Sequence, residues 1–297
     1  MIPKIIHFIN IGTREFLYFH YIVVRMARAV NPDFEIMLHY TDEPGGQWWE
    51  KAKSHCTMNK VEYKDEIFGN KIKNPAHVAD VIRLEILKEI GGIYLDLDVI
   101  CVNSFEPLLK EDMVMGIEPD NGLCNAVIIA QKGAKFIEDW YAQYKNFDSD
   151  IWNYHSVKLP WRLYKNGTHP INVQDQYAFF YPLPNDPWHV ALWGKKISKK
   201  ALVKRFMRDI VKGALSFLSS DKASITPYSY SLKNVLRSAA WHEHKFKNSY
   251  CMHMWEGYWR KDYLSKMTPE YIQSSPSCIA GIIRSRLGDN AIGVSDD

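Results

Sequence analysis

One stretch, Asn74 to Cys101, constrains the fold more than any other part of the chain. It opens with Asn74-Pro75, in which the asparagine can cap a helix and the proline suits the first helical position. Apolar residues recur at helical spacing up to Ile90, and Gly91-Gly92 supplies the left-handed geometry that ends a helix. We expect a buried strand over Ile93–Cys101 to follow directly. A helix that leads into a buried strand is a building unit of an α/β sheet.

The rest of the chain extends this alternation of strands and helices, which predicts an α/β fold with a mostly parallel sheet. The expected strands are 4–11, 34–40, 60–63, 113–117, 125–130 and 179–182, and the expected helices are 14–30, 47–54 and 135–144. With 297 residues the chain can form one domain. We therefore expect a single domain over 1–297 that contains a helical, loop-rich insert at 140–225.

Acidic residues interrupt the apolar pattern of the expected strand 93–101. Because side chains alternate along a strand, Tyr94, Asp96 and Asp98 would share one face. Two neighbouring carboxylates repel each other and are costly to bury unpaired. A divalent cation with a preference for oxygen ligands, Mn²⁺ or Mg²⁺, removes both costs. Since ligands of such sheets collect at the carboxyl ends of the strands, we expect the cation there.

Composition limits the partners and the compartment. With 37 basic and 34 acidic residues, the net charge gives no reason to expect nucleic acid as a partner. Five scattered cysteines without a CxxC pair favour a reducing compartment. The chain begins without the pattern of a signal peptide, and no apolar run reaches the roughly 18 residues of a spanning helix. These features predict a cytoplasmic protein.

The segment 195–218 is basic and amphipathic. It carries eight lysines and arginines against one acid, Asp209, and its apolar residues recur at helical spacing. One interpretation is a helix on an anionic membrane surface, which would place the protein peripherally at the inner face of the membrane. The other is a helix that packs on the core and exposes a solvated basic face.

Three motifs together resemble those of a known enzyme family. They are HFINIG at 7–12, ADxxRxxxL followed by GGIYLDLD within 79–98, and HMWEGYW at 253–259. Asp-x-Asp alone is a weak signal, but the string Ala76–Asp98 is specific. The set resembles glycosyltransferases with a DXD-containing sugar-binding region. That group includes family 32, with bacterial capsular-polysaccharide and yeast mannosyl enzymes, and more distantly the catalytic domain of large clostridial glucosylating toxins.

The resemblance implies a GT-A fold, in which helices flank a Rossmann-like, mixed and mostly parallel sheet. It implies retaining transfer of a hexose from a nucleotide-sugar donor, UDP-linked rather than GDP-mannose, with Mn²⁺ or Mg²⁺ as cofactor. The expected acceptor is a glycan or lipid-linked glycan, in surface polysaccharide or capsule biosynthesis. Asp98 would bind the metal, and Asp96 the ribose or a metal-bound water. Asp80 and Arg83 would hold hydroxyls of the donor sugar, so these four residues form the expected catalytic set.

Further positions match donor contacts of the family. Asn10 stands where relatives often carry tryptophan, so backbone contacts from Phe8 and Ile9 would replace stacking on the base. His253 matches a histidine and is our expected third metal ligand or phosphate contact, although a core histidine beside Trp255 fits the sequence equally well. The expected donor-binding residues are Phe8, Ile9, Asn10, Asp80, Arg83, Tyr94, Asp96, Asn125 and Trp259.

Several alternatives remain open on the sequence alone. Asp80 and Arg83 could form an ordinary surface ion pair at i,i+3. A haloacid-dehalogenase-type phosphohydrolase also places Asp-x-Asp after an apolar strand, but Val99-Ile100 stand where that class usually has Gly-Thr. A carbohydrate-binding protein without activity, or a toxin-like enzyme with a protein acceptor, would share the same motifs. No residue identifies itself as a nucleophile, so by analogy we expect a front-face mechanism.

Overall fold

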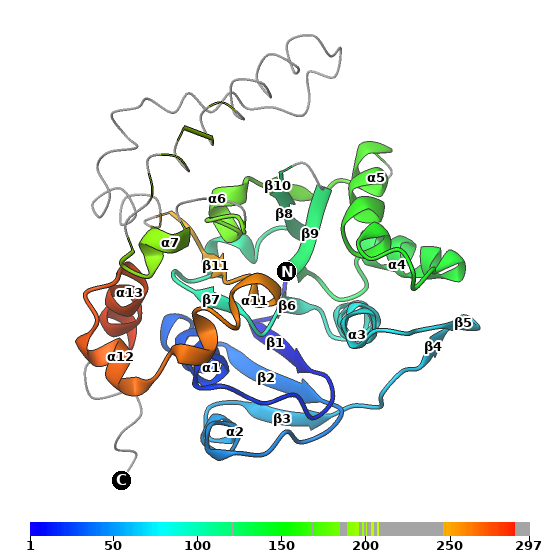
Figure 1. Cartoon of the computed structure of the whole chain (residues 1–297). Coiled ribbons are helices and arrows are strands. Elements are labelled where there is room, and N and C mark those ends of the chain that lie inside the picture. The colour runs from blue at the N-terminus through cyan, green and yellow to red at the C-terminus, as the bar shows by residue number, and fades with distance from the viewer. Residues whose placement is uncertain are drawn as a thin grey trace.

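Seven strands form one mixed sheet, in the order β10-β8-β9-β6-β1-β2-β3 (Figure 1). The computed structural model describes residues 1–119, 122–167, 169–184, 189–195, 198, 200, 203, 204, 207, 246 and 248–288. The sheet contains β1 (Ile5–Asn10), β2 (Glu35–Tyr40), β3 (Thr57–Lys60), β6 (Gly92–Leu95), β8 (Met113–Glu118), β9 (Gly122–Ala130) and β10 (Asn172–Gln174). Two short antiparallel pairs lie outside it: β4 (Glu66–Ile67) with β5 (Asn70–Lys71), and β7 (Val99–Cys101) with β11 (Cys251–His253).

Strand direction confirms the expected mixed, mostly parallel sheet. β1 pairs in parallel with both β2 and β6, β2 with β3, and β8 with β10. β9 alone among the sheet's strands runs antiparallel to its two neighbours, β6 and β8. β10 comes from the segment 140–225, so this segment contributes to the edge of the sheet.

Helices cover both faces of the sheet (Figure 1). They are α1 (Tyr18–Val30), α2 (Gln47–Lys53), α3 (Pro75–Glu89), α4 (Lys135–Ala142), α5 (Leu159–Lys165), α6 (Gln176–Phe179), α7 (His189–Leu192), α11 (Glu256–Trp259), α12 (Pro269–Ser274) and α13 (Cys278–Leu287). Alternation along β1 separates two cores: Phe8 packs with α1 and α13, and Ile9 packs with α3 and α4. Burial of apolar side chains on both faces accounts for the nearly continuous apolar strands.

Local signals determine where α3 begins and ends. The Asn74 side chain accepts a hydrogen bond from the Ala76 amide at 2.9 Å, and Pro75 occupies the first helical position. After the helix, Gly91 and Gly92 have φ of 75° and 108°, in the region that favours glycine. A Cβ on Gly92 would lie 2.7 Å from the Ile5 carbonyl oxygen, so the close approach of β6 to β1 also requires glycine.

Several expected elements differ from the structure. The expected strand 93–101 is wrong, because the chain leaves the sheet after Leu95 and Val99–Cys101 pairs with β11 instead. The expected strand 179–182 is also wrong: Asp175 caps the short helix α6, and 172–174 forms the edge strand. The third strand covers Thr57–Lys60 rather than 60–63, and α1 begins at Tyr18 rather than at 14. These shifts follow tertiary pairing, which overrides local propensity.

The basic segment 195–218 lies almost entirely outside the described residues, so neither interpretation of it is tested. Among the helices of the described ranges, none has the length and the apolar character needed to span a membrane.

A chain of buried polar groups links β1 to its neighbours. His7 Nε2 lies 2.9 Å from the Gly91 carbonyl oxygen, and His7 Nδ1 lies 3.0 Å from His39 Nε2. His39 Nδ1 lies 2.8 Å from the Asn59 amide nitrogen. Every contact is satisfied when both rings are neutral, with a proton on each Nε2. Burial lowers the pKa of His7 to about 4, and burial together with His7 lowers the pKa of His39 to about 3.

This histidine pair predicts acid sensitivity. Below pH 6.5 an unfolded chain protonates both rings, whereas the folded protein keeps them neutral until their lowered pKa values of about 4 and 3 are reached. The free energy of unfolding should therefore fall between pH 6.5 and 4, by about 1.4 kcal/mol per pH unit for each ring. Urea unfolding across this range measures the slope. The double variant His7→Gln/His39→Gln should have a much flatter profile, and an unchanged slope would contradict the prediction.

Candidate active site

Asp96 and Asp98 lie in a tight turn between β6 and β7. The Asp96 amide donates to the Ala126 carbonyl oxygen at 2.9 Å, so the chain stays hydrogen-bonded to β9 up to this residue. The Val99 amide then donates to the Asp96 carbonyl oxygen at 2.9 Å and closes the turn. Because β6 runs parallel to β1, the turn lies at the carboxyl edge of the parallel strands, where ligands of such sheets bind.

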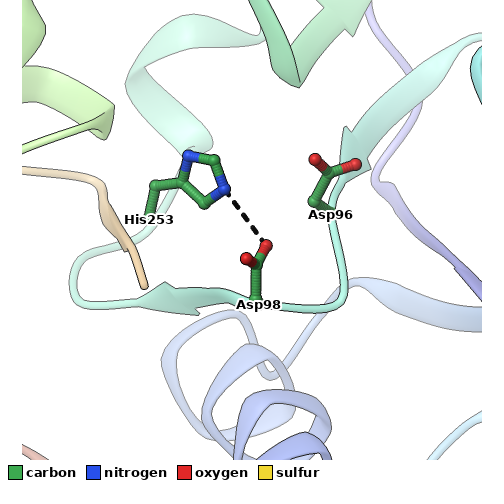
Figure 2. A group of neighbouring side chains, drawn as sticks. All are labelled: Asp96, Asp98 and His253. Atoms are coloured by element: carbon green, nitrogen blue, oxygen red, sulfur yellow. Dashed lines mark ion pairs between the residues drawn. The ribbon is translucent and has the colours of Figure 1, made fainter. Parts of the chain in front are cut away.

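His253 joins the two aspartates from the other end of the chain. β11 pairs with β7, which places His253 opposite Val99. Its Nε2 lies 3.2 Å from Asp98 Oδ1, and Figure 2 shows the three side chains facing a common space. One ligand atom of each residue lies within 4.8 Å of the others. The expected grouping of His253 with the two aspartates is therefore present in the structure.

Charge in this group is set by the Asp98–His253 pair. Burial alone would raise the pKa of Asp98, but His253 and the Glu256 amide lower it below its ordinary value. Burial alone would lower the pKa of His253, but the Asp98 carboxylate raises it. His253 Nδ1 is buried and has no hydrogen-bond partner among the described residues. A divalent cation in place of the proton would satisfy Asp98 and His253 equally, so the donor set fits a metal.

Arg83 connects the predicted acids on the other side of the turn. Its Nη2 lies 3.0 Å from Asp80 Oδ1, and its Nη1 lies 3.0 Å from Asp96 Oδ1. Nη1 also donates to the Asn125 carbonyl oxygen at 2.8 Å. Asp80 and Arg83 are only 6% and 4% exposed, so the alternative of a surface ion pair is wrong. A buried guanidinium that serves several acceptors positions carboxylates, because its donors have a fixed planar geometry.

Asn125 and Tyr94 complete this network. The Asn125 side-chain amide donates to Asp80 Oδ1 at 2.7 Å, and the Tyr94 hydroxyl donates to Asp96 Oδ1 at 2.6 Å. The Arg83 guanidinium lies 4.4 Å from the centre of the Tyr94 ring. Burial raises the pKa of Tyr94 well above 10, which keeps the hydroxyl a proton donor. Asp96 Oδ1 thus accepts a hydrogen bond from Tyr94 and forms an ion pair with Arg83.

Glu256 was missed by the sequence analysis. Its backbone amide donates to Asp98 Oδ2 at 2.7 Å, directly after Trp255, which has a left-handed backbone with φ of 47°. Its carboxylate Oε1 lies 3.1 Å from His20 Nε2 on α1 and 3.3 Å from Arg14 Nη2, and it also accepts from Arg260. Glu256 therefore holds the turn that contacts Asp98. Its place three residues after His253 was the only sequence signal.

We expect the Glu256→Gln substitution to weaken Mn²⁺ binding about tenfold. The substitution keeps the shape of the side chain but removes the charge that holds Arg14, Arg260 and His20, and groups that orient metal ligands commonly contribute this much. Calorimetric titration of Mn²⁺ in the presence of nucleotide measures the affinity. Glu15→Gln is the matched control, because the Glu15 carboxylate is 77% exposed and meets Arg260 at 3.5 Å. Equal Mn²⁺ affinity in the two variants would contradict the role of Glu256.

The remaining predicted donor contacts occupy less direct positions. The side chains of Phe8 and Ile9 are buried in the two cores, so only the backbone of these two residues could contact a donor at the end of β1. The Asn10 side chain donates to the Gly12 carbonyl oxygen at 3.1 Å. Trp259 is 3% exposed and its ring stacks on His189, with ring centroids 4.9 Å apart. The structure does not bring these residues into the group of Asp96, Asp98 and His253.

Comparison with known proteins identifies the family. Residues 19–115 match the family described as "Glycosyltransferase sugar-binding region containing DXD motif". Glucan organizing enzyme 1 of Cryptococcus neoformans var. grubii is 31% identical over 284 residues, which cover 92% of this chain and 65% of that protein. Mannosyl phosphorylinositol ceramide synthase SUR1 of Saccharomyces cerevisiae is 27% identical over 215 residues, with coverages of 64% and 52%.

The chain therefore spans between about half and two thirds of the length of these relatives. Among solved structures, the PaToxG glycosyltransferase superposes with a TM-score of 0.44 and 16% identity, with 84% of each chain covered. The matched residues 19–115 contain Asp80, Arg83, Asp96 and Asp98, which form one connected group in the structure. Residues 19–115 of this chain thus match the sugar-binding region with a DXD motif of this group of glycosyltransferases.

Proposed function

We propose that this protein is a metal-dependent, retaining hexosyltransferase that uses a nucleotide sugar, with UDP as the favoured nucleotide. The acceptor would be a glycan or a lipid-linked glycan, in the biosynthesis of a surface polysaccharide. The observation that carries the proposal is the convergence of Asp96, Asp98 and His253 beside the buried Asp80–Arg83 pair. A phosphohydrolase would give the buried Arg83 network no role.

Asp98 and His253 would hold Mn²⁺ or Mg²⁺, with Asp96 at its side. When bound, such a cation neutralises the negative charge that a nucleoside diphosphate gains as its bond to the sugar breaks. The Glu256 amide keeps Asp98 Oδ2 fixed while Oδ1 faces His253. The protein thereby presents its acidic groups already oriented, which avoids the cost of reorganising them during the reaction.

Arg83 would align the donor sugar through the acids that it holds. Burial of Arg83 is outweighed by Asp96, Tyr94 and Asp80, which raise its pKa and keep it charged. Its permanent positive charge then holds both carboxyl groups in place, and their oxygens can accept hydrogen bonds from sugar hydroxyls. Exact placement of the sugar can contribute several kcal/mol to catalysis, because it removes the entropy cost of orientation.

Retention would follow a front-face route, in which the departing diphosphate takes the proton of the acceptor hydroxyl. A double displacement would instead need an available carboxylate as nucleophile. Both Asp80 and Asp96 are held by Arg83 at 3.0 Å, which supports a role in binding rather than in nucleophilic attack.

The relatives differ in the products that their names describe. One is named for a glucan and the other for a mannosyl product on an inositol-containing ceramide. Both names support a glycan or glycolipid acceptor. The mannosyl product of the second relative makes GDP-mannose the second donor to test. A toxin-like enzyme with a protein acceptor has no specific support in these names.

Calorimetric titration of UDP and of GDP, each with Mn²⁺ and with EDTA, tests the proposal. We expect one nucleotide to bind only when Mn²⁺ is present, and slow hydrolysis of the matching nucleotide sugars then identifies the hexose. The product anomer, followed by NMR before mutarotation, reports retention. Absence of metal-dependent binding for both nucleotides would overturn the proposed function.

A further inference from the structure

An exposed tryptophan lies on a short loop near the catalytic group. The loop, residues 148–153, follows the 3₁₀ turn Gln143–Asn146 and precedes the helical turn Tyr154–Lys158. Trp152 is 64% exposed and the adjacent Ile151 is 47% exposed. Single exposed apolar residues are common on protein surfaces, so exposure alone does not indicate a binding site. The indication of a binding site comes from the way this loop is anchored and from its location.

The buried side chain of His77 on α3 anchors the loop. Its Nε2 lies 3.1 Å from the Trp152 carbonyl oxygen, and its Nδ1 lies 3.2 Å from the Ser149 hydroxyl. The His77 ring also contacts the indole, with ring centroids 5.5 Å apart. His77 itself is only 3% exposed. The indole is therefore supported by a buried group rather than displayed on a loose loop.

A second set of contacts ties the loop to the residues before α3. The Lys73 amide donates to the Ser149 hydroxyl at 2.9 Å, and Lys73 Nζ lies 2.7 Å from Asp150 Oδ2. Within the loop, the Asp150 amide donates to Asp148 Oδ1 at 2.9 Å. Hydrogen bonds with Lys73 and His77 thus hold the side chain of Ser149 and the backbone of Trp152. A preorganised aromatic group loses little conformational entropy when it binds a ligand.

The location relates the loop to the donor site. α3 leads directly into β6, so the first turns of α3 lie at the same edge of the sheet as the end of β6, where Asp96 is found. His77 precedes Asp80 by one turn of this helix. The loop with Trp152 is therefore anchored on α3 one helical turn before Asp80, at the edge of the sheet where Asp96 lies.

We propose that Trp152 is the acceptor platform of this enzyme, and that its exposed indole face stacks on a pyranose ring of the glycan acceptor. The inference rests on the proposed glycosyltransferase function. A pyranose has an apolar face of C–H groups, which packs on a flat aromatic ring, and a rim of hydroxyls. The same loop carries the carboxylates of Asp148 and Asp150, which can accept hydrogen bonds from those hydroxyls. Because Lys73 is paired with Asp150, the loop presents no excess positive charge of the kind that attracts an anionic lipid surface.

Saturation-transfer NMR with three neutral trisaccharides, maltotriose, laminaritriose and mannotriose, tests the proposal on the full chain. We expect at least one to bind, Trp152→Ala to weaken its binding about five- to tenfold, and Trp152→Tyr to retain most of it because a flat ring remains. Phe68→Ala is the matched control, because Phe68 is also an exposed aromatic residue, at 50%, but lies on the turn between β4 and β5. This control should bind like the original protein.

Three results would overturn the proposal. In the first, none of the three sugars binds. In the second, Trp152→Ala binds a sugar as well as the original protein does. In the third, Trp152→Ala keeps sugar binding but no longer binds vesicles of phosphatidylcholine and phosphatidylserine. Titration of UDP and GDP with Mn²⁺ on the same samples distinguishes failure of the acceptor platform from failure of the proposed function. If a nucleotide binds but Trp152 has no effect on sugar binding, only the acceptor platform fails, whereas loss of nucleotide binding would indicate that the proposed function itself fails.

Discussion

Replacement of Asp98 by asparagine should abolish metal-dependent nucleotide binding and reduce the rate of transfer by about 10³-fold. Asp98 is 8% exposed, and its two oxygens contact His253 Nε2 and the Glu256 amide. Asparagine keeps the size of the side chain but carries no charge, and it cannot accept with both of its terminal atoms. The cation would then lose its strongest ligand.

Calorimetry with nucleotide and Mn²⁺ measures the binding, and hydrolysis of the nucleotide sugar measures the rate. The variant loses the ion pair with His253, so its stability should fall, but asparagine keeps the size of the side chain and can still accept the hydrogen bond from the Glu256 amide, so the variant should fold. A thermal unfolding scan provides this control. Metal-dependent nucleotide binding that survives in the Asp98→Asn variant would contradict the assignment of Asp98 as a metal ligand.

The second large effect is expected for Arg83→Met. This change removes the guanidinium that Asp80 and Asp96 share and leaves both carboxyl groups buried or partly buried without it. Loss of one partner from a buried ionic group costs about 3–5 kcal/mol of folding stability. Urea unfolding measures the loss of stability. Donor hydrolysis should also fall to the background rate, because Asp80 and Asp96, which we propose to hold the sugar, would lose their fixed positions.

Two further variants separate charge from geometry at this position. Arg83→Lys restores a positive charge but cannot reach both carboxylates and the Asn125 carbonyl oxygen together, so stability should return in part while activity stays low. Addition of Asp80→Asn to Arg83→Met removes one unpaired carboxylate and should recover part of the lost stability without restoring activity. A lysine variant with full activity would show that only the charge matters.

Much of the fold around the site could be predicted because its signals are local. Asn74 and Pro75 start α3, Gly91 and Gly92 end it, and the spacing of Asp80 and Arg83 places both on one face of that helix. These features depend on residues within a few positions of one another. The structure also confirms the mostly parallel sheet that the alternation of strands and helices predicted, and the mixed character that the family resemblance implied.

The turn at Asp96 and Asp98 could not be predicted in the same way. The apolar run from Ile93 to Cys101 has the pattern of one strand, and the break depends on pairing of β7 with β11, about 150 residues later in the chain. The contacts of Glu256 with His20 and Arg14 are equally distant in sequence. Local patterns carry no information on such pairs. His253 was expected from the family motif, but the role of Glu256 in holding Asp98 was found only in the structure.

The pairing of β7 with β11 also has a consequence for protein synthesis. Since a growing chain emerges from its amino end, Asp96 and Asp98 leave the ribosome well before His253 and Glu256. Until β11 docks on β7, Asp98 lacks its two contacts, and the ligand group is incomplete. An unfinished chain would therefore carry the sequence motif without the complete ligand group. That group forms only after residues 251–256 have been synthesised and β11 has paired with β7.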